Sequence, residues 1–200
     1  MPSTTTSSRD VSVAFGLSVA SVCWTVVSGS LSIAIGIQDH VAVLVAFGAV
    51  GAVDAIGSVA LAYHFHHARR HDQLSERLEA VAHRVVLVGL SAVGLSAVVG
   101  GIIRVLAGSD TDSPTAGIVL AAASTVVLAI LSVAKQRVGR RIGSDALVSD
   151  GHVSGMGAIL GAVTLVGTAM ARWFGWTWVD GAFTIVVGLG ALRLAWVTWS

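Results

Sequence analysis

The chain has 200 residues, of which 54% are hydrophobic and only 12% are charged, and its mean hydropathy is +0.84. A soluble domain carries about 25% charged residues, so these values exclude an ordinary cytosolic enzyme or a disordered chain and favour an integral membrane protein. The net charge of +1 implies no nucleic-acid partner, and the single cysteine, Cys23, excludes a disulfide framework.

Six long apolar stretches predict an all-α membrane protein, a bundle of six transmembrane helices. Each stretch has about the 20 residues that a helix needs to cross a bilayer, and none alternates as the strands of a barrel do. We expect a polar cytoplasmic tail at residues 1–10, one transmembrane domain at 11–200, and no C-terminal cytoplasmic domain. The predicted helices cover about residues 11–37, 41–63, 85–106, 114–134, 147–171 and 177–199.

Basic residues predict the orientation of this bundle. They gather between the second and third helices and between the fourth and fifth: Arg69, Arg70, Arg77, Arg84, Lys135, Arg137, Arg140 and Arg141. Short loops rich in Lys and Arg stay in the cytoplasm, so both termini are expected there. Trp173, Trp176 and Trp178 then mark the outer interface. Eleven arginines against one lysine indicate a GC-rich bacterial genome, and hence the plasma membrane.

Two aspartates within the apolar stretches are the main candidate functional residues. Asp54 lies in the middle of the second stretch, where an ionised aspartate costs about 2.5–3.5 kcal/mol on insertion scales. Asp150 lies near the start of the fifth. At a rise of 1.5 Å per residue, Asp54 is about 15 Å outward of His64 and Asp150 about 14 Å outward of Arg141. The two carboxylates are therefore expected to meet at one depth.

Such a pair suggests metal and proton exchange. Two carboxylates in a low-dielectric site attract a divalent cation, and without it they hold at least one proton. The alternative is that each aspartate simply bonds a neighbouring helix, for instance through a serine or threonine hydroxyl. For Asp180, at the start of the sixth helix, a capping role is favoured over a ligand role.

Short motifs resemble the transmembrane domain of the cation diffusion facilitators, a zinc and manganese efflux family, and chiefly its vertebrate vesicular zinc-transporting branch. Residues 146–151, Ala-Leu-Val-Ser-Asp-Gly, are similar to the motif that opens the fifth helix of that branch. Residues 178–181, Trp-Val-Asp-Gly, are similar to the start of its sixth helix. Asp54 takes the second of two ligand positions, four residues apart, in the second helix. The likeness covers roughly residues 14–199 and implies a homodimeric exporter of zinc or manganese.

The chain departs from the family at three ligand positions. The first ligand position of the second helix falls on Val50, and the fifth helix has Val153 and Gly157 where the family has a histidine and an aspartate. The resemblance therefore leaves Asp54 as a metal ligand, with Asp150 as a substitute for the missing ones.

Hydroxyl groups are predicted to complete this reduced metal site. Ser58 and Ser154 each follow one of the two aspartates by four residues, which is one helical turn. A site of carboxylates, hydroxyls and water offers harder ligands than most zinc sites do, and it suits manganese or magnesium at least as well as zinc. Zinc keeps first place only because the resemblance implies it.

A histidine-rich connection follows the second helix and suggests an accessory metal-collecting segment. His67 and His71 are four residues apart and share one face of a helix, and neutral imidazole is a good zinc ligand. His71, Arg77 and Glu79 keep the register of a family motif at this place, although its proline, tyrosine and glycines are absent. The alternative is a basic segment that binds phospholipid headgroups through Arg69 and Arg70.

The sequence thus supports two hypotheses of different classes. The first is a transporter that moves a divalent cation out of the cytoplasm, coupled to protons moving in, without a bound cofactor. The second is a non-transporting membrane subunit or regulatory scaffold with a degenerate metal site. An enzyme is not expected, because no nucleophile triad, phosphate-binding loop or dinucleotide fingerprint is present.

Overall fold

The computed structural model describes residues 8–68, 76–107, 115–176 and 178–199. Within these ranges the structure describes the backbone but not the side chains of a smaller set, namely residues 8–11, 54, 57, 60–62, 64–68, 76–86, 107, 145–146, 149 and 198–199.

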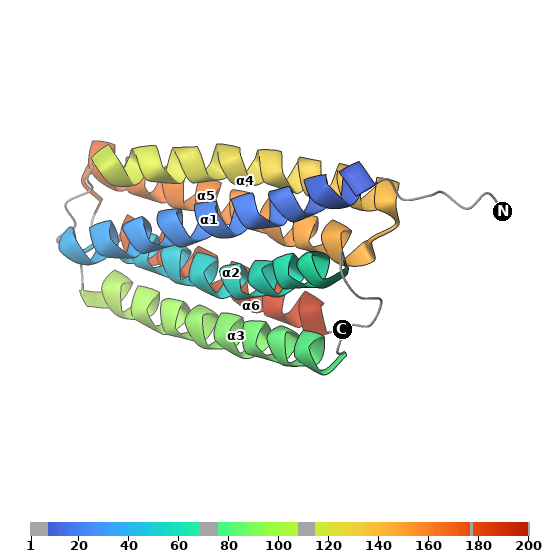
Figure 1. Ribbon diagram of the computed structural model, residues 1–200. Helices are drawn as coiled ribbons and strands as arrows, with labels where there is room; N and C mark the ends of the chain where they lie inside the picture. The colour runs from blue at the N-terminus through green and yellow to red at the C-terminus, as the bar shows by residue number, and fades with distance from the viewer. Residues whose placement is uncertain (1–7, 69–75, 108–114, 177, 200) are drawn as a thin grey trace.

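Six helices make up nearly all of the described chain, and no strand occurs within it. They run side by side along one common direction, and the first turn of α1 lies at the same end of the bundle as the last turn of α6 (Figure 1). The all-α fold expected from the sequence is confirmed. The helices are α1 Ser8–Gln38, α2 Ala42–Ala68, α3 Glu76–Ala107, α4 Thr115–Ile142, α5 Asp145–Phe174 and α6 Val179–Trp199.

At the end of the bundle where α1 begins, helices α3 and α4 extend beyond the apolar stretches from which they are predicted. Helix α3 starts at Glu76 rather than near residue 85, and α4 continues to Ile142 rather than ending near 134. The estimate from sequence stopped at the first charged residue. A helix does not stop there, because Arg137, Arg140 and Arg141 extend the last turns of α4 with exposed side chains that cost the helix nothing.

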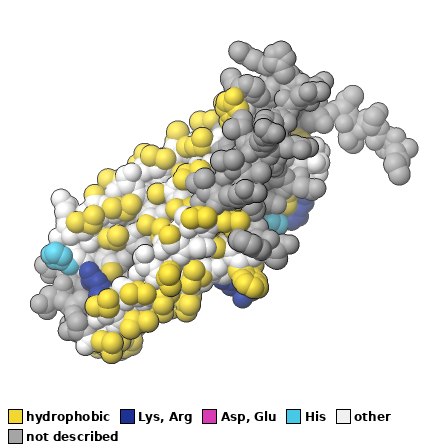
Figure 2. Space-filling model, turned by 90° about the horizontal axis from the view of Figure 1, so that it is seen from below, with side chains coloured by type: hydrophobic (Ala, Val, Ile, Leu, Met, Phe, Trp, Pro, Cys, Tyr) yellow, Lys and Arg dark blue, Asp and Glu magenta, His cyan; other side chains and the backbone are white. Residues whose placement is uncertain are grey.

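Within the part of the chain that the structure describes, five helices are long and apolar enough to cross a membrane: Ser12–Gln38, Leu87–Leu106, Thr115–Ile142, Asp150–Phe174 and Val179–Val197. In α2, the apolar stretch found among the described residues is Ala42–Val53. Large apolar side chains such as Val88, Leu106 and Trp196 point outward, and Figure 2 shows hydrophobic side chains spread along the visible face. A surface of this kind is typical of contact with lipid. The described fold is therefore that of a multi-pass membrane protein.

Glycines allow α3 and α6 to pack backbone to backbone. A Cβ atom added to Gly94 of α3 would lie 2.9 Å from the carbonyl oxygen of Gly188, and one added to Gly101 would lie 2.7 Å from that of Gly181. Real Cβ atoms do not approach a backbone oxygen so closely, so only glycine fits at these crossings. Small residues serve the same purpose generally in membrane helices.

Replacing Gly94 by leucine is expected to force α3 away from α6 and to lower the stability of the bundle by about 1–3 kcal/mol, as overpacking typically does. Gly100, on the same helix, is the matched control, because nothing lies within 4 Å of a Cβ added there. Thermal unfolding in detergent should show a lower midpoint for Gly94→Leu than for Gly100→Leu. Equal midpoints would contradict the close crossing.

A tight turn joins α4 to α5. Gly143 takes the left-handed conformation with φ of 67°, which glycine adopts without strain. The Ser144 hydroxyl then caps α5 by accepting a hydrogen bond from the backbone N–H of Leu147 at 3.3 Å. This short connection makes α4 and α5 antiparallel neighbours, so residues a few positions before and after the turn face each other.

Candidate functional site

A buried ion pair joins α4 to α5 near this turn. The ammonium nitrogen of Lys135 lies 2.6 Å from Oδ2 of Asp150. The Lys135 side chain is fully buried, and that of Asp150 is 11% exposed. Among the described residues, Oδ2 accepts no hydrogen bond of good geometry, so the lysine charge is its neutralising contact. A buried charge without such a partner would cost several kcal/mol.

Serine hydroxyls surround this pair. The Lys135 ammonium donates hydrogen bonds to Oγ of Ser21 on α1, at 2.8 Å, and to Oγ of Ser154 on α5, at 3.0 Å. The three donors of an ammonium group therefore face two hydroxyls and one carboxylate. On the other side, Ser58 of α2 donates a hydrogen bond of 3.1 Å to Oδ1 of Asp150. Four helices thus meet at this pair.

Close packing of α4 on α5 brings the two charges together. A Cβ added to Gly151 would lie 3.1 Å from the carbonyl oxygen of Ser132, and Ser132 donates a 2.7 Å hydrogen bond to the carbonyl oxygen of Gly151. Lys135 lies one turn beyond Ser132 on the same buried face of α4. The glycine next to Asp150 therefore lets the lysine-bearing helix approach the carboxylate directly.

The position of Lys135 differs from the one expected from the sequence. The sequence predicts it in a basic connection with Arg137, Arg140 and Arg141, but it lies inside the bundle, about 10 Å before the end of α4. The three arginines do have the accessible side chains that a charge cluster at a helix end predicts. Lys135 instead belongs to the buried stripe of α4, which consists of Gly117, Ala121, Ser124, Leu128, Leu131, Ser132, Lys135 and Gly139.

The depth of Asp150 also differs. The expected depth of about 14 Å counted nine residues from Arg141, but Arg141 belongs to α4 and α5 begins at Asp145, so Asp150 is only about 8 Å from the start of its helix. Its contact on α2 is Ser58, so Ser58 lies level with it. Asp54 is one helical turn, about 6 Å, further from that end along α2. By backbone register this places residue 54 near the level of Ser154.

Four of the predicted site residues lie outside the described side chains. Asp54 belongs to α2, His67 to the last turn of α2 and Glu79 to the first turns of α3, but only their backbone is described, and His71 falls between the described helices. The meeting of Asp54 with Asp150 and the role of the histidine segment therefore stay predictions. Among the side chains that are described, no three His, Cys, Asp or Glu residues come together as metal ligands would.

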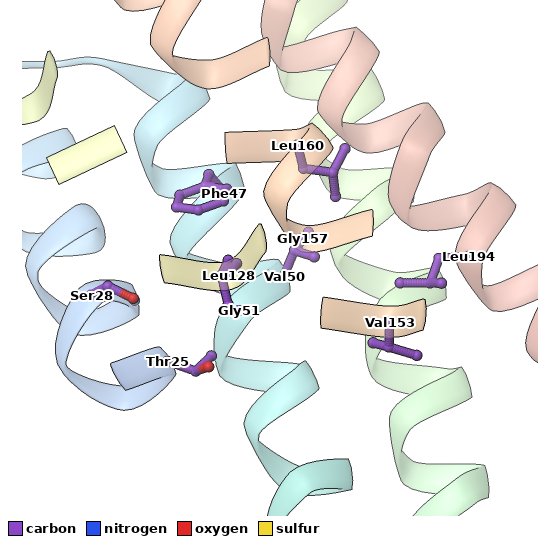
Figure 3. Close-up of a pocket in the computed structure, with 11 residues that line it drawn as sticks. Thr25, Ser28, Phe47, Val50, Gly51, Leu128, Val153, Gly157, Leu160 and Leu194 are labelled. Carbon is purple, nitrogen blue, oxygen red and sulfur yellow. The ribbon is translucent and has the colours of Figure 1, made fainter. Parts of the chain in front are cut away.

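The three positions at which the resemblance implies lost ligands come together in space. Val50 of α2 and Val153 and Gly157 of α5 line one small cavity of about 20 Å³. Figure 3 shows Val50 between Thr25 and Ser28 of α1 on one side and the α5 residues on the other. A cavity of this size holds about one water molecule.

The lining of this cavity is apolar apart from α1. Thr25 and Ser28 supply hydroxyl groups, and the Thr25 hydroxyl is buried with no hydrogen-bond partner among the described residues. Valines and a glycine offer no metal ligand. The charged centre therefore lies about one to two turns away from the cavity, at Asp150 and Lys135.

Asp180 has a capping role, but on a different helix from the one expected. Its carboxylate accepts hydrogen bonds from the backbone N–H groups of Ala42, at 3.1 Å, and Val43, at 3.0 Å, which start α2. Arg104 of α3 pairs with the same carboxylate at 3.0 Å and donates a 2.6 Å hydrogen bond to the carbonyl oxygen of His40. Asp180 thus fastens α2, α3 and α6 together at the end opposite the buried pair, and it is not available as a metal ligand.

Fold and site together define a class: an all-helical, multi-pass membrane protein with an ion pair buried between four of its helices. Comparison with known protein families found no family whose model matches the chain, and no curated protein matches it.

Proposed function

We propose that the protein transports a divalent cation, zinc or manganese, across a membrane in exchange for protons, with Asp54 and Asp150 as its ion ligands. One observation carries the proposal: the Asp150 carboxylate is buried in a membrane-type bundle and contacts α2 through Ser58, one turn from Asp54. Intramembrane carboxylates are rare and typically line ion or proton pathways.

The arrangement gives the ion the oxygen ligands that it needs. Asp54 and Asp150 supply carboxylates, while Ser58 and Ser154 supply hydroxyls within one turn of them. Manganese and other hard cations prefer such oxygen sets. Protons compete for the same carboxylates, so protons from the side to which the ion is released take its place in the site, and they leave the site on the other side. The convergence of Val50, Val153 and Gly157 on one cavity also supports the register implied by the resemblance.

For the rest of the molecule, we propose that α2 crosses the membrane in addition to the other five helices, and that both termini lie in the cytoplasm. The arginines at the end of α4 then face the cytoplasm, and the exposed Trp173, Trp176 and Trp178 face the outer interface. The ion therefore meets Asp150 from the cytoplasmic end and leaves through the outer half. A bacterial plasma membrane and a homodimer complete the proposal.

The test is metal-driven proton flux in liposomes that contain the purified protein. Asp54→Asn and Asp150→Asn should each reduce the flux driven by zinc or manganese at least about tenfold, because each removes a charged ligand. Asp39→Asn is the matched control, since Asp39 lies in the connection between α1 and α2, remote from Asp150. Flux that survives both ligand changes would contradict the proposal.

A specific observation favours a second candidate, a non-transporting subunit. The three positions at which the resemblance implies ligands are apolar. Of the two predicted ligands Asp54 and Asp150, only the side chain of Asp150 is described, and Lys135 already neutralises it. In that case the ion pair would only hold α4 and α5 together. Wild-type protein would then drive no proton flux with either metal, and Asp54→Asn would leave its assembly with other proteins unchanged.

A further inference from the structure

Lys135 occupies the place where an ion would bind Asp150. Its ammonium nitrogen lies 2.6 Å from Oδ2, and a bound zinc ion would lie closer still to a carboxylate oxygen, at about 2.0–2.2 Å, in the same space. Lysine and metal ion therefore cannot both hold that oxygen. Since Oδ1 already accepts a hydrogen bond from Ser58, Oδ2 is the atom for which they compete.

We infer that Lys135 is a tethered cation that fills the Asp150 end of the transport site when the site is empty and yields to the transported ion. This inference rests on the proposed transport function. When the ion binds Oδ2, the ammonium group keeps its proton and stays on Ser21 and Ser154, which already hold it. No bond or proton is exchanged in this step. The carboxylate only changes the cation that it neutralises.

The burial of Lys135 and Asp150 indicates from which side an ion can reach the carboxylate. Lys135 is fully buried, and Ser21 and Ser154 are 0% and 1% exposed, whereas the Asp150 side chain keeps 11% exposure. Oδ2 itself is buried, so an ion first contacts the accessible part of the Asp150 side chain and reaches Oδ2 from there, while the lysine holds Oδ2 from the interior. The lysine needs only to swing away from Oδ2 while it keeps its hydrogen bonds to Ser21 and Ser154, a movement that its flexible side chain permits.

The charges explain why a transporter would use such a lysine. Two carboxylates alone would bind a divalent cation with full neutralisation, deep in a low-dielectric bundle, and would release it slowly. The fixed positive charge of Lys135 repels the ion once it is bound and re-forms the pair with Asp150 when the ion leaves. Lys135 therefore lowers the affinity for the ion and favours its release, and it is not itself an ion ligand.

Removing this charge tests the inference. In liposomes with an entrapped metal indicator, Lys135→Met should lower the KM for manganese and zinc about tenfold and lower kcat, because the competing charge is gone. A purely structural lysine would leave KM unchanged or raise it. Equilibrium binding of manganese in detergent should show the same tightening in Lys135→Met, even where turnover is too slow to measure.

Ser21→Ala, a smaller change, is expected to raise the KM that Lys135→Met lowers. Ser21→Ala removes one of the two hydroxyls that hold the displaced ammonium, so it should raise KM about threefold, an order-of-magnitude value for one hydrogen bond to a charged group. In the Lys135→Met background, Ser21→Ala should have no effect on KM. Ser18→Ala is the matched control on the same face of α1, because among the described residues the Ser18 hydroxyl donates its hydrogen bond to the carbonyl oxygen of Ala14 in its own helix.

The outcomes separate the two proposals. If the wild type carries metal but Lys135→Met keeps the same KM, or if Ser21→Ala still raises KM without Lys135, the tethered-cation inference is wrong and the transport function stands. If Lys135→Met releases fewer protons per ion than the wild type, the lysine gives up its proton, which also overturns the inference. If the wild type neither binds nor carries zinc or manganese, both proposals are wrong.

Discussion

Replacing Asp150 with leucine is expected to lower the free energy of unfolding by about 3–5 kcal/mol, the typical effect of removing one partner of a buried ion pair. The reason is the burial of Lys135, whose ammonium group would keep only the hydroxyls of Ser21 and Ser154. Lys135→Leu should have an effect of similar size, because it leaves the Asp150 carboxylate without its counter-charge. Thermal unfolding in detergent, followed by circular dichroism, measures both.

The double variant Lys135→Leu/Asp150→Leu should recover most of this loss. Two leucines bury no charge, and exchange of a buried ion pair for apolar side chains is often neutral or stabilising. The coupling energy from the four proteins should therefore reach several kcal/mol. Arg140→Leu is the control on the same helix, because its 3.4 Å contact with Gln136 is exposed and contributes little. Additive effects of the two single variants would show that the charges are not paired.

Lys135 illustrates where reading the sequence failed and where it could have succeeded. Its charge lies close to those of Arg137, Arg140 and Arg141, and counting charges places all four at a membrane surface. Helical periodicity separates them. Leu128, Ser132, Lys135 and Gly139 recur every three or four residues on the buried face of α4, whereas the arginines fall on other faces. Helical periodicity therefore predicts a buried Lys135, whereas the number of nearby charges predicts an exposed one.

Asp180 illustrates a contact that local sequence does not encode. An aspartate in the first turn of a helix predicts a favourable interaction with its own helix terminus. The structure uses it instead to cap α2, whose first residues are 138 and 137 positions away in sequence. That choice depends on how α2, α3 and α6 pack at the end of the bundle. Only the number, order and approximate centres of the helices follow from local hydrophobicity.

The ion pair of Asp150 with Lys135 combines a residue that charge counting misplaces with a contact that local sequence does not encode. The sequence singled out Asp150 because a carboxylate in an apolar stretch needs a partner, and that reasoning holds. It also allowed a hydroxyl from a neighbouring helix as the partner, and Ser58 supplies one. The lysine was missed because its neighbour in space follows from the tight turn at Gly143 and the close approach at Gly151, which are details of packing.

Introducing the three ligands that the resemblance implies should create a zinc site in the cavity next to this pair. Val50, Val153 and Gly157 line one cavity of about 20 Å³, so Val50→Asp, Val153→His and Gly157→Asp would direct their side chains toward a common point (Figure 3). A Cβ at residue 157 would lie 3.3 Å from the flexible end of Leu128, which can yield. With Asp54, the triple variant offers four ligands, the number that a closed zinc site requires.

The expected result is zinc binding at least about 100-fold tighter than in the wild type, because a tetrahedral set of nitrogen and oxygen ligands replaces an apolar lining. Cobalt bound in the same site should show the intense visible absorption of tetrahedral coordination, and zinc should raise the unfolding midpoint by mass action. Adding Asp54→Asn to the triple variant removes the fourth ligand and should weaken binding again.

A folded triple variant that binds cobalt no better than the wild type would show that these positions do not converge on one ion, and the register implied by the resemblance would be wrong. Tight binding without dependence on Asp54 would instead remove Asp54 from the site, and with it the proposed sharing of an ion with Asp150.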